Sequence, residues 1–184
     1  MILEAIVTTI NEDGSTNISP MGPTVSADLS QFVLRPFETS TTFANLKRTK
    51  SGVMHVTDDV LMFARSAIGD KPMEARTKDA EKVEGKILLD ACRYYEFRVE
   101  FIDETGARMS LNCQTVGSGR LRDFWGFNRA KHAVIEAAIL ATRLDFLPSS
   151  EIEESMVRLQ TIVDKTAGPQ EIEAMSLISK YIGG

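Results

Sequence analysis

The chain has 184 residues, of which 43% are hydrophobic, 26% charged and 7% aromatic, and this composition excludes a disordered or fibrous protein. Its 21 basic and 26 acidic side chains give a net charge of -5, which argues against nucleic acid as a partner because an acidic surface repels a phosphate backbone. No apolar stretch approaches a membrane span and the N-terminus lacks the pattern of a secretory signal, so we expect a cytoplasmic protein without membrane contact.

The N-terminal region predicts a hairpin followed by an irregular loop. Residues 2–11 read as a strand, and the Asp-Gly pair at 13–14 indicates a turn into a short strand at 16–19. Because proline cannot donate to a β-ladder, we expect regular pairing to stop near Pro20 and the backbone to stay open as far as Pro23. A strand that ends in such a loop is a suitable place for a ligand.

Between residues 31 and 69 the pattern alternates between short strands and short helices. The expected elements are a strand at 31–35, a helix that begins at the hydroxyl-rich residues 39–42 and ends at Gly52, a strand at 53–57, and a helix at 59–68 that Asp58 caps and Gly69 ends. Residues 70–86 are rich in charge, and we expect a poorly ordered, exposed excursion there.

Two longer strands are expected at 91–103 and 107–116. The apolar pattern favours a register that pairs Phe101 with Met109, Val99 with Leu111 and Phe97 with Cys113, around a loop at 104–106. In this register Cys92 and Cys113 point to opposite faces, so we expect two reduced thiols and no disulfide.

After a break in composition at Gly117-Ser118-Gly119, helical periodicity replaces strand alternation. The expected helices are 127–146, a second begun by a capping box of Ser150 and Glu153 with Ile152, Met156, Leu159 and Val163 on one face, and a third after Gly168-Pro169 that buries Ile172, Met175, Ile178 and Ile182. Strands followed by helices predict an α+β protein, with a β-barrel or sheet at 1–119 and a helical C-terminal subdomain at 120–184.

One group of residues suits a phosphate. The loop from Asn17 to Gly22 and the helix start at 39–42 offer backbone N–H groups and hydroxyls, and Arg35 lies between them in the sequence. On spacing alone, an ordinary loop and an ordinary helix cap are the commoner roles for these two segments.

A polar stripe on the long C-terminal helix is the second candidate. Asn128, His132 and Glu136 recur at intervals of four, with Arg129 beside them, on a helix that is otherwise rich in alanine. The stripe is either a solvated helix face or the border of a substrate pocket, which aromatic residues at 124–125 would cover.

Familiar catalytic motifs are missing from the sequence. There is no glycine-rich phosphate loop, no His-Glu-x-x-His and no Gly-x-Ser-x-Gly, and two histidines with two unclustered cysteines do not make a zinc site. We therefore expect no metal, apart from the remote option of a two-residue site at His132 and Glu136, and name no catalytic residue.

The order of several short motifs resembles a known superfamily. Asn-x-Ser-Pro-x-Gly at 17–22, Ser-Thr-Thr-Phe-Ala-Asn-Leu at 40–46 and the strand 52–56 are similar to the flavin reductase-like branch of the FMN-binding split-barrel proteins, over about residues 1–120. With residues 127–133 included, nearly the full length resembles an uncharacterised family of that superfamily with a helical C-terminal extension. The resemblance implies an FMN-binding split β-barrel with a C-terminal helical subdomain.

The resemblance also implies which residues hold the flavin. Residues along the isoalloxazine and ribityl chain would be Asn17, Ser19, Pro20, Met21 and Gly22, and those beside the phosphate Ser40, Thr41, Thr42 and Asn45. Glycine 22 stands where the superfamily has serine, and Ser40-Thr41 where it has Lys-Asp. The phosphate therefore needs another cation, for which Arg35 is the first candidate and Lys47, Arg48 and Arg65 are reserves. On the substrate side, the candidates are Trp125, Asn128, Arg129 and His132.

The implied function is that of an FMN-dependent oxidoreductase acting on a small molecule, in a homodimer that completes the flavin site. Two alternatives remain open: a flavin carrier or sensor without turnover, and a binding module for another phosphorylated heterocycle. The sequence names neither the electron donor nor the acceptor.

Overall fold

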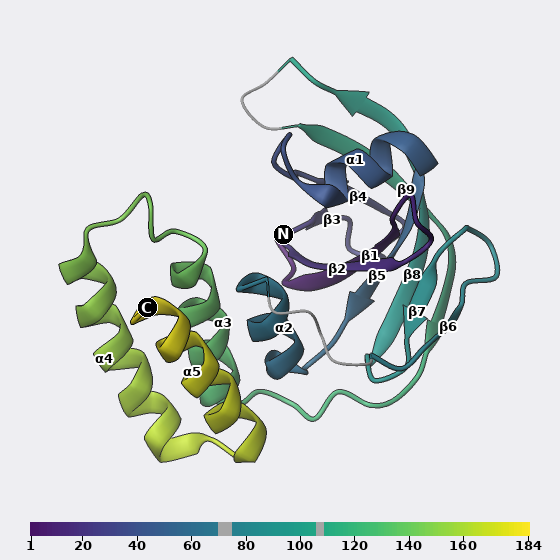
Figure 1. Ribbon diagram of the computed structural model, residues 1–184. Helices are drawn as coiled ribbons and strands as arrows, with labels where there is room; N and C mark the ends of the chain where they lie inside the picture. Colours follow the sequence, from purple (N-terminus) through teal and green to yellow (C-terminus); the bar gives the residue numbers. More distant parts are fainter. Residues whose placement is uncertain (70–74, 106–108) are drawn as a thin grey trace. The chain divides into compact units, whose positions relative to one another are not determined.

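The computed structural model describes residues 1–69, 75–105 and 109–184 (Figure 1). The chain divides into two compact units, the first formed by Met1–Thr57 and Glu74–Asp123 and the second by Asp58–Met73 and Phe124–Gly184. Within the described ranges, every helix is too short or too polar to cross a membrane.

The first unit is built on a seven-stranded antiparallel sheet with the strand order β2-β1-β5-β8-β9-β4-β3. The strands are β1 (Ala5–Ile10), β2 (Thr16–Met21), β3 (Thr24–Val25), β4 (Gln31–Leu34), β5 (Ser51–Val56), β8 (Arg93–Asp103) and β9 (Ser110–Arg120). Helix α1 (Thr41–Thr49) and a small hairpin of β6 (Thr77–Asp79) and β7 (Lys86–Leu88) complete the unit. The sheet curls into a half-barrel (Figure 1) around an apolar interior that includes Leu34, Met54, Phe97 and Leu111.

The hairpin of β1 and β2 confirms the turn predicted from the Asp-Gly pair, since Gly14 has φ +82. Pairing ends at Met21, one residue beyond Pro20, close to the expected end, and Pro20 itself still pairs with Ile6. Strand β2 lies at the edge of the sheet. A proline there costs little, because no further strand needs an N–H from that side.

Helix α1 begins as predicted and ends earlier than predicted. The Oγ of Ser40 accepts a hydrogen bond from Phe43 N–H at 3.1 Å, and Lys50 closes the helix in the left-handed conformation. Gly52 therefore does not end the helix and lies inside β5. A Cβ at Gly52 would lie 2.8 Å from the Phe97 ring and 2.9 Å from Thr8 O, so only glycine fits this position.

The predicted register of the longest hairpin is wrong by two residues at Phe97 and Val99, and by three at Phe101, which pairs with Asn112. Val99 pairs with Cys113 and Phe97 with Thr115, because β-bulges shift the register between β8 and β9. The loop expected at 104–106 lies in part outside the described residues, which omit 106–108. Cys92 and Cys113 are both buried and are not joined by a disulfide.

The expected break at Gly117-Ser118-Gly119 is also wrong, because β9 runs on to Arg120. The two glycines make room for side chains of the neighbouring strand β8. A Cβ at Gly119 would lie 2.6 Å from the Tyr94 ring, and one at Gly117 would lie 3.3 Å from Glu96. These glycines therefore mark close packing inside a strand.

The charged segment 70–86 lies in part outside the described residues, which omit 70–74. Most of the rest, residues 75–86, is exposed as expected, but it contains the β6–β7 pairing, which the sequence did not predict. The hairpin is tied to the sheet by Thr8 Oγ1, which donates to Lys86 O at 2.6 Å. The Lys82 N–H donates to the buried carboxylate of Glu96 at 2.5 Å.

A buried histidine of β5, His55, also contacts β7. His55 donates through Nδ1 to Ile6 O at 3.2 Å, and its Nε2 accepts from Leu88 N–H at 3.0 Å. Burial lowers the pKa of His55 from 6.5 to about 4, although the bond to Ile6 acts in the opposite direction.

We expect this histidine to make the free energy of unfolding fall as the pH is lowered. The unfolded chain takes up a proton near pH 6.5 and the folded chain only near pH 4, so stability is lost through that interval. Between pH 7 and pH 5 the loss should be about 2 kcal/mol in urea titrations. An equally steep decline in a His55→Asn variant would show that other groups cause it.

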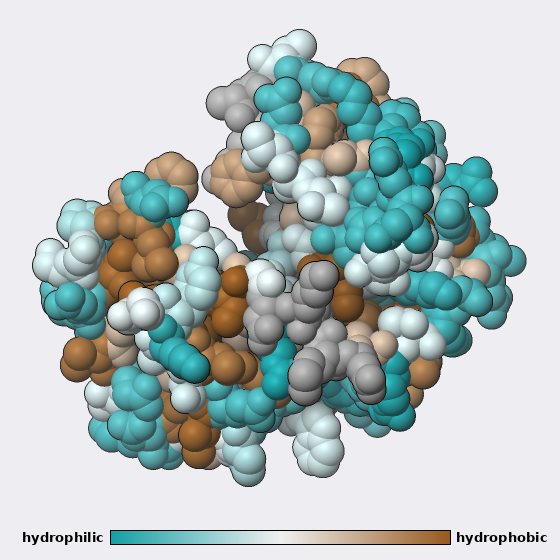
Figure 2. Space-filling model, viewed as in Figure 1, coloured by the Kyte–Doolittle hydropathy of each residue, from teal (hydrophilic) through white to brown (hydrophobic). Residues whose placement is uncertain are grey.

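The second unit is a cluster of four helices: α2 (Val60–Ala67), α3 (Arg129–Ala141), α4 (Ser149–Thr166) and α5 (Pro169–Ile182). Alanines and branched residues, among them Val60, Ala133, Val134, Val163 and Ile178, form its core. The predicted apolar face of α4 is confirmed. On the face that Figure 2 shows, hydrophobic residues gather over the helices of this unit.

Three details of the helical prediction are wrong. Helix α3 is shorter than 127–146, because Asn128 caps it and it ends at Ala141. Helix α4 begins at Ser149, and no side-chain hydrogen bond caps it. Ile172 is 57% exposed, not buried.

A buried ion pair ties the helices together. Lys131 Nζ lies 2.8 Å from Glu171 Oε1 and donates to Asp58 O at 2.7 Å. The other oxygen of Glu171 accepts from Gly168 N–H at 2.8 Å. Burial acts to raise the pKa of Glu171, but the hydrogen bonds from Lys131 and Gly168 outweigh it and leave the pKa below its ordinary value.

Candidate functional site

A network of amides and hydroxyls joins β1, β2 and the first turns of α1. Asn17 Nδ2 donates to Thr9 Oγ1 at 3.1 Å and to Thr42 Oγ1 at 3.0 Å. Asn45 Nδ2 donates to the same Thr9 hydroxyl at 3.0 Å and to Asn11 Oδ1 at 2.7 Å. Three of the residues proposed from the sequence, Asn17, Thr42 and Asn45, are therefore brought together around Thr9.

The start of α1 offers further donors. The Ser40 hydroxyl is occupied, since it caps the helix and donates to Phe37 O at 2.7 Å. Helix geometry leaves the N–H groups of Thr41 and Thr42 without a partner inside the helix, and the Thr41 side chain is exposed. Positive charge at a helix N-terminus and two open N–H groups favour an anion here.

Of the four basic residues considered as partners for such an anion, one remains available. Lys47 pairs with Glu104 at 2.8 Å, and Arg48 donates to the carbonyl of Ile10. Arg65 lies on α2 in the second unit, where it pairs with Glu173. Arg35 is exposed and makes no hydrogen bond or ion pair with any residue in the described ranges, so it alone of the four is available.

The segment from Ser19 to Gly22 presents backbone to the surface. Ser19, Pro20 and Met21 are half-buried at the end of β2, and Gly22 is exposed. The backbone of Gly22 is not in the left-handed region, and a Cβ there would meet only Ile2 Cγ2, at 3.3 Å. Conformational freedom is thus not the reason for glycine at this position, and open access to the main chain is what it provides.

The residues proposed for a substrate lie in the second unit. Asn128 has a structural role, because its Oδ1 accepts from Lys131 N–H and its Nδ2 donates to Thr166 O, both at 3.1 Å. Trp125, Arg129 and His132 are exposed. Among the residues that the structure describes, no three His, Cys, Asp or Glu side chains cluster as a metal site would require.

Sequence reasoning missed Thr9 and Asn11, which complete the network. The only indication of their role in the sequence was that they are polar residues in or next to a largely hydrophobic strand. Thr9 is fully buried. A buried polar residue in a strand needs a partner. Which partner it finds depends on the pairing of β1 and on the packing of α1, neither of which the sequence reveals.

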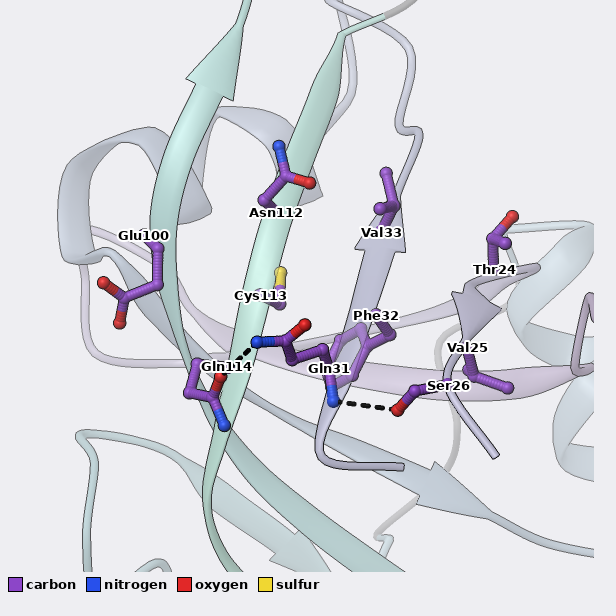
Figure 3. Close-up of a pocket in the computed structure, with 10 residues that line it drawn as sticks. All are labelled: Thr24, Val25, Ser26, Gln31, Phe32, Val33, Glu100, Asn112, Cys113 and Gln114. Carbon is purple, nitrogen blue, oxygen red and sulfur yellow. Dashed lines mark hydrogen bonds between the residues drawn. The ribbon is translucent and has the colours of Figure 1, made fainter. Parts of the chain in front are cut away.

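A shallow groove of about 370 Å³ lies on the outer face of β3, β4, β8 and β9 (Figure 3). Its lining residues are Thr24, Val25, Ser26, Gln31, Phe32, Val33, Glu100, Asn112, Cys113 and Gln114. Across the groove, Gln31 Nε2 donates to Gln114 Oε1 at 3.1 Å. No Lys or Arg lines this groove and Glu100 does, so its chemistry does not suit a phosphate. None of the cofactor residues proposed from the sequence lines it.

Solved structures share this fold. An FMN-bound protein from Methanosarcina mazei is 25% identical in sequence, with a TM-score of 0.84, over 98% of this chain and 94% of that one. An FMN-binding protein from Thermus thermophilus with bound 1-cyclohex-2-enone has 17% identity and a TM-score of 0.53, over 64% and 70% of the two chains. The flavin reductase HpaC, solved with NADP+, has 17% identity and a TM-score of 0.55, over 70% and 83%.

These similarities confirm the predicted α+β fold, a flavin reductase-like split barrel with a helical C-terminal part. At the level of sequence, the N-terminal domain of the protein of unknown function DUF447 matches residues 3–122. The second DUF447 domain matches residues 128–180. The two matches together span almost the whole sequence, and the chain therefore belongs to the DUF447 family.

Proposed function

We propose that this protein binds FMN in its first unit and uses it in electron transfer with a small molecule. The observation that carries the proposal is the FMN-bound Methanosarcina mazei relative, which belongs to the same family and matches over almost the whole chain. FMN is the cofactor to which this relationship points, and the residues around α1 fit its phosphate.

The phosphate end of the site has the chemistry that a dianion needs. The N–H groups at the start of α1, the exposed Thr41 hydroxyl and the guanidinium of Arg35 supply donors, and the first turn of α1 contains no acidic side chain. Asn17 and Asn45 do not need to move to form this cradle, because Thr9 and Thr42 already fix them. A site whose groups are held in advance loses less entropy on binding.

The flat end of the site is assigned to the backbone from Ser19 to Gly22. An aromatic ring system can approach this segment closely because Gly22 has no side chain. FMN, when bound, supplies the redox chemistry, while the protein orients it and provides hydrogen bonds. None of the residues proposed to bind FMN is a histidine or a carboxylate, so we assign no acid or base to the protein.

The exposure of Arg35, Thr41 and Gly22 has a further implication for assembly. Small-molecule sites bury most of their ligand, but in a single chain these three groups face the surface. We propose that a second copy of the chain covers the site in a homodimer. Loss of FMN on dilution, in parallel with dissociation seen by sedimentation, is the expected result.

An oxidoreductase and a flavin carrier can be told apart directly. We expect the absorption of bound FMN near its visible maxima to bleach when NADH or NADPH is added without oxygen, and to return when an acceptor is added. Flavin that stays oxidised with both donors would favour a carrier. A purified protein without any flavin would instead favour another phosphorylated heterocycle.

The phosphate assignment predicts a preference for FMN over riboflavin. Charge-assisted hydrogen bonds contribute about 1.5–3 kcal/mol each, so FMN should bind at least about tenfold more tightly in a fluorescence-quenching titration. An Arg35→Gln variant should lose most of this preference and keep its affinity for riboflavin. Arg93→Gln, which changes another exposed arginine of the same unit, is the matched control, and equal affinity for the two flavins would refute the assignment.

A further inference from the structure

Three aromatic side chains gather at the surface where the chain enters α3. Phe124 is 49% exposed, Trp125 87% and Phe127 92%. Each such ring offers 150–250 Å² of apolar surface. Single exposed apolar residues are common, but a contiguous aromatic group on the surface indicates a binding site.

The backbone that carries these rings is anchored. The Trp125 N–H donates to Oδ2 of the buried Asp58 at 2.9 Å, and Gly126 takes the left-handed conformation, with φ +95. Directly after the rings, Asn128 caps α3. The backbone that carries the exposed aromatic rings is therefore held in place by partly buried hydrogen bonds, so ligand binding needs to order less of it.

The rings also contact one another in an ordered way. Phe124 and Phe127 meet edge to face with their centroids 6.1 Å apart. The imidazole of His132, one turn into α3, stacks on Phe127 at 6.1 Å with an interplanar angle of 23°. A flat molecule can extend this stack on the exposed face of Phe127, and the exposed Trp125 ring offers a second surface nearby in the sequence.

Both charges occur near the rings: Asp123, next to Phe124, pairs with Arg120, and a positive group follows Phe127. Arg129, the first residue of α3, is exposed and forms no ion pair or hydrogen bond with any residue that the structure describes. Lys131, two residues later, is occupied by Glu171. The nearest acidic group further along the helix is Glu136, a turn beyond His132. A free guanidinium beside aromatic rings is complementary to a ring that carries an acidic group.

We propose that Phe124, Trp125, Phe127 and Arg129 form a binding site for a planar heteroaromatic molecule with phosphate or another acidic group. The rings stack on the flat part of the molecule, and Arg129 binds its acidic group. All four residues belong to the second unit, whereas the residues proposed to bind FMN belong to the first. This stacking site deepens the proposed function, because nucleotides of this class exchange electrons with flavins. A redox role for the stacking site therefore rests on the proposed function.

Trp125 makes the site directly observable, because it is the only tryptophan of the chain. We expect NADP+, which combines heteroaromatic rings with phosphates, to quench Trp125 fluorescence in a saturable titration of the full-length protein. Phe127→Ala should weaken this binding about tenfold, by loss of stacking. Arg129→Gln should weaken it about fivefold at low salt, and less at high salt.

Matched controls lie in the same unit. Phe146 is 78% exposed and outside the aromatic group, so Phe146→Ala should leave the titration unchanged, as should Arg143→Gln. Quenching that does not saturate, or that is equal in all variants, overturns the proposal. The proposal is also overturned if Trp125 fluorescence changes with protein concentration and not with NADP+. That result would mean that another copy of the chain covers the rings.

The two proposals fail separately. A Gly22→Val variant, made to block the FMN cradle, is expected to retain NADP+ quenching of Trp125. Native protein that binds NADP+ through these residues but never binds FMN would refute the flavin proposal alone. Native protein that binds FMN but shows no saturable quenching by NADP+ would refute the stacking site alone.

Discussion

A Gly22→Val variant is expected to bind FMN at least ten to a hundred times more weakly than the native protein and to melt at the native temperature. The added isopropyl group would occupy the space that a flat ring needs against the main chain, and steric conflicts of this size cost about 1–3 kcal/mol. The fold should be unaffected, because Gly22 is exposed and its φ is not in the left-handed region. Flavin titration and thermal melting of the same sample measure both effects.

Gly22→Ala separates the site from a purely structural role. A Cβ meets only the side chain of Ile2 at 3.3 Å, and Ile2 is itself 68% exposed and can shift. The alanine variant should therefore melt like the native protein and lose less FMN affinity than the valine variant. Parallel losses of melting temperature and affinity in both variants would mean that this loop matters for structure only.

The second large effect is expected in the helical unit, where Lys131→Met should lower the free energy of unfolding by about 3 kcal/mol. Methionine replaces the aliphatic stem of the lysine but leaves Glu171, whose side chain is 7% exposed, without its cationic partner. A charge that is buried and unpaired accounts for most of the loss. Urea titration measures the free energy of unfolding. As a control, Lys180→Met changes an exposed lysine on α5, the helix that carries Glu171. It should change the free energy of unfolding by no more than about 0.5 kcal/mol.

A double variant tests whether the pair itself is responsible. Lys131→Met with Glu171→Gln removes the isolated charge, while the glutamine oxygen can still accept from Gly168 N–H. The double variant should be more stable than Lys131→Met alone. If the two losses simply add, the interaction between Lys131 and Glu171 contributes nothing to stability.

Local signals in the sequence were sufficient for much of the first unit. The Asp-Gly pair located the β1–β2 turn, and the hydroxyl of Ser40 located the start of α1. Both depend on residues within a few positions of one another, which is why a linear pattern contains them. The resemblance then supplied the split barrel and FMN, which local patterns alone did not.

Non-local features could not be read in the same way. The bulges that displace the register of β8 and β9, and the glycines that make room for Tyr94 and Glu96, depend on the neighbouring strand. In the candidate site, Asn17 and Asn45 came from the resemblance, but the shared contact with Thr9 did not. A strand reveals which face a residue is on, not which helix will pack over that face.

The helical unit is discontinuous in sequence, because α2 comes from between β5 and β6 while the other three helices follow Asp123. The helical unit therefore cannot be isolated by a single cut in the chain. A fragment of residues 124–184 would contain every residue of the second family match, yet it would lack Val60 and Ala64, which belong to the helical core. An isolated helical unit would therefore need residues 58–69, which contain α2, joined through a linker to residues 124–184.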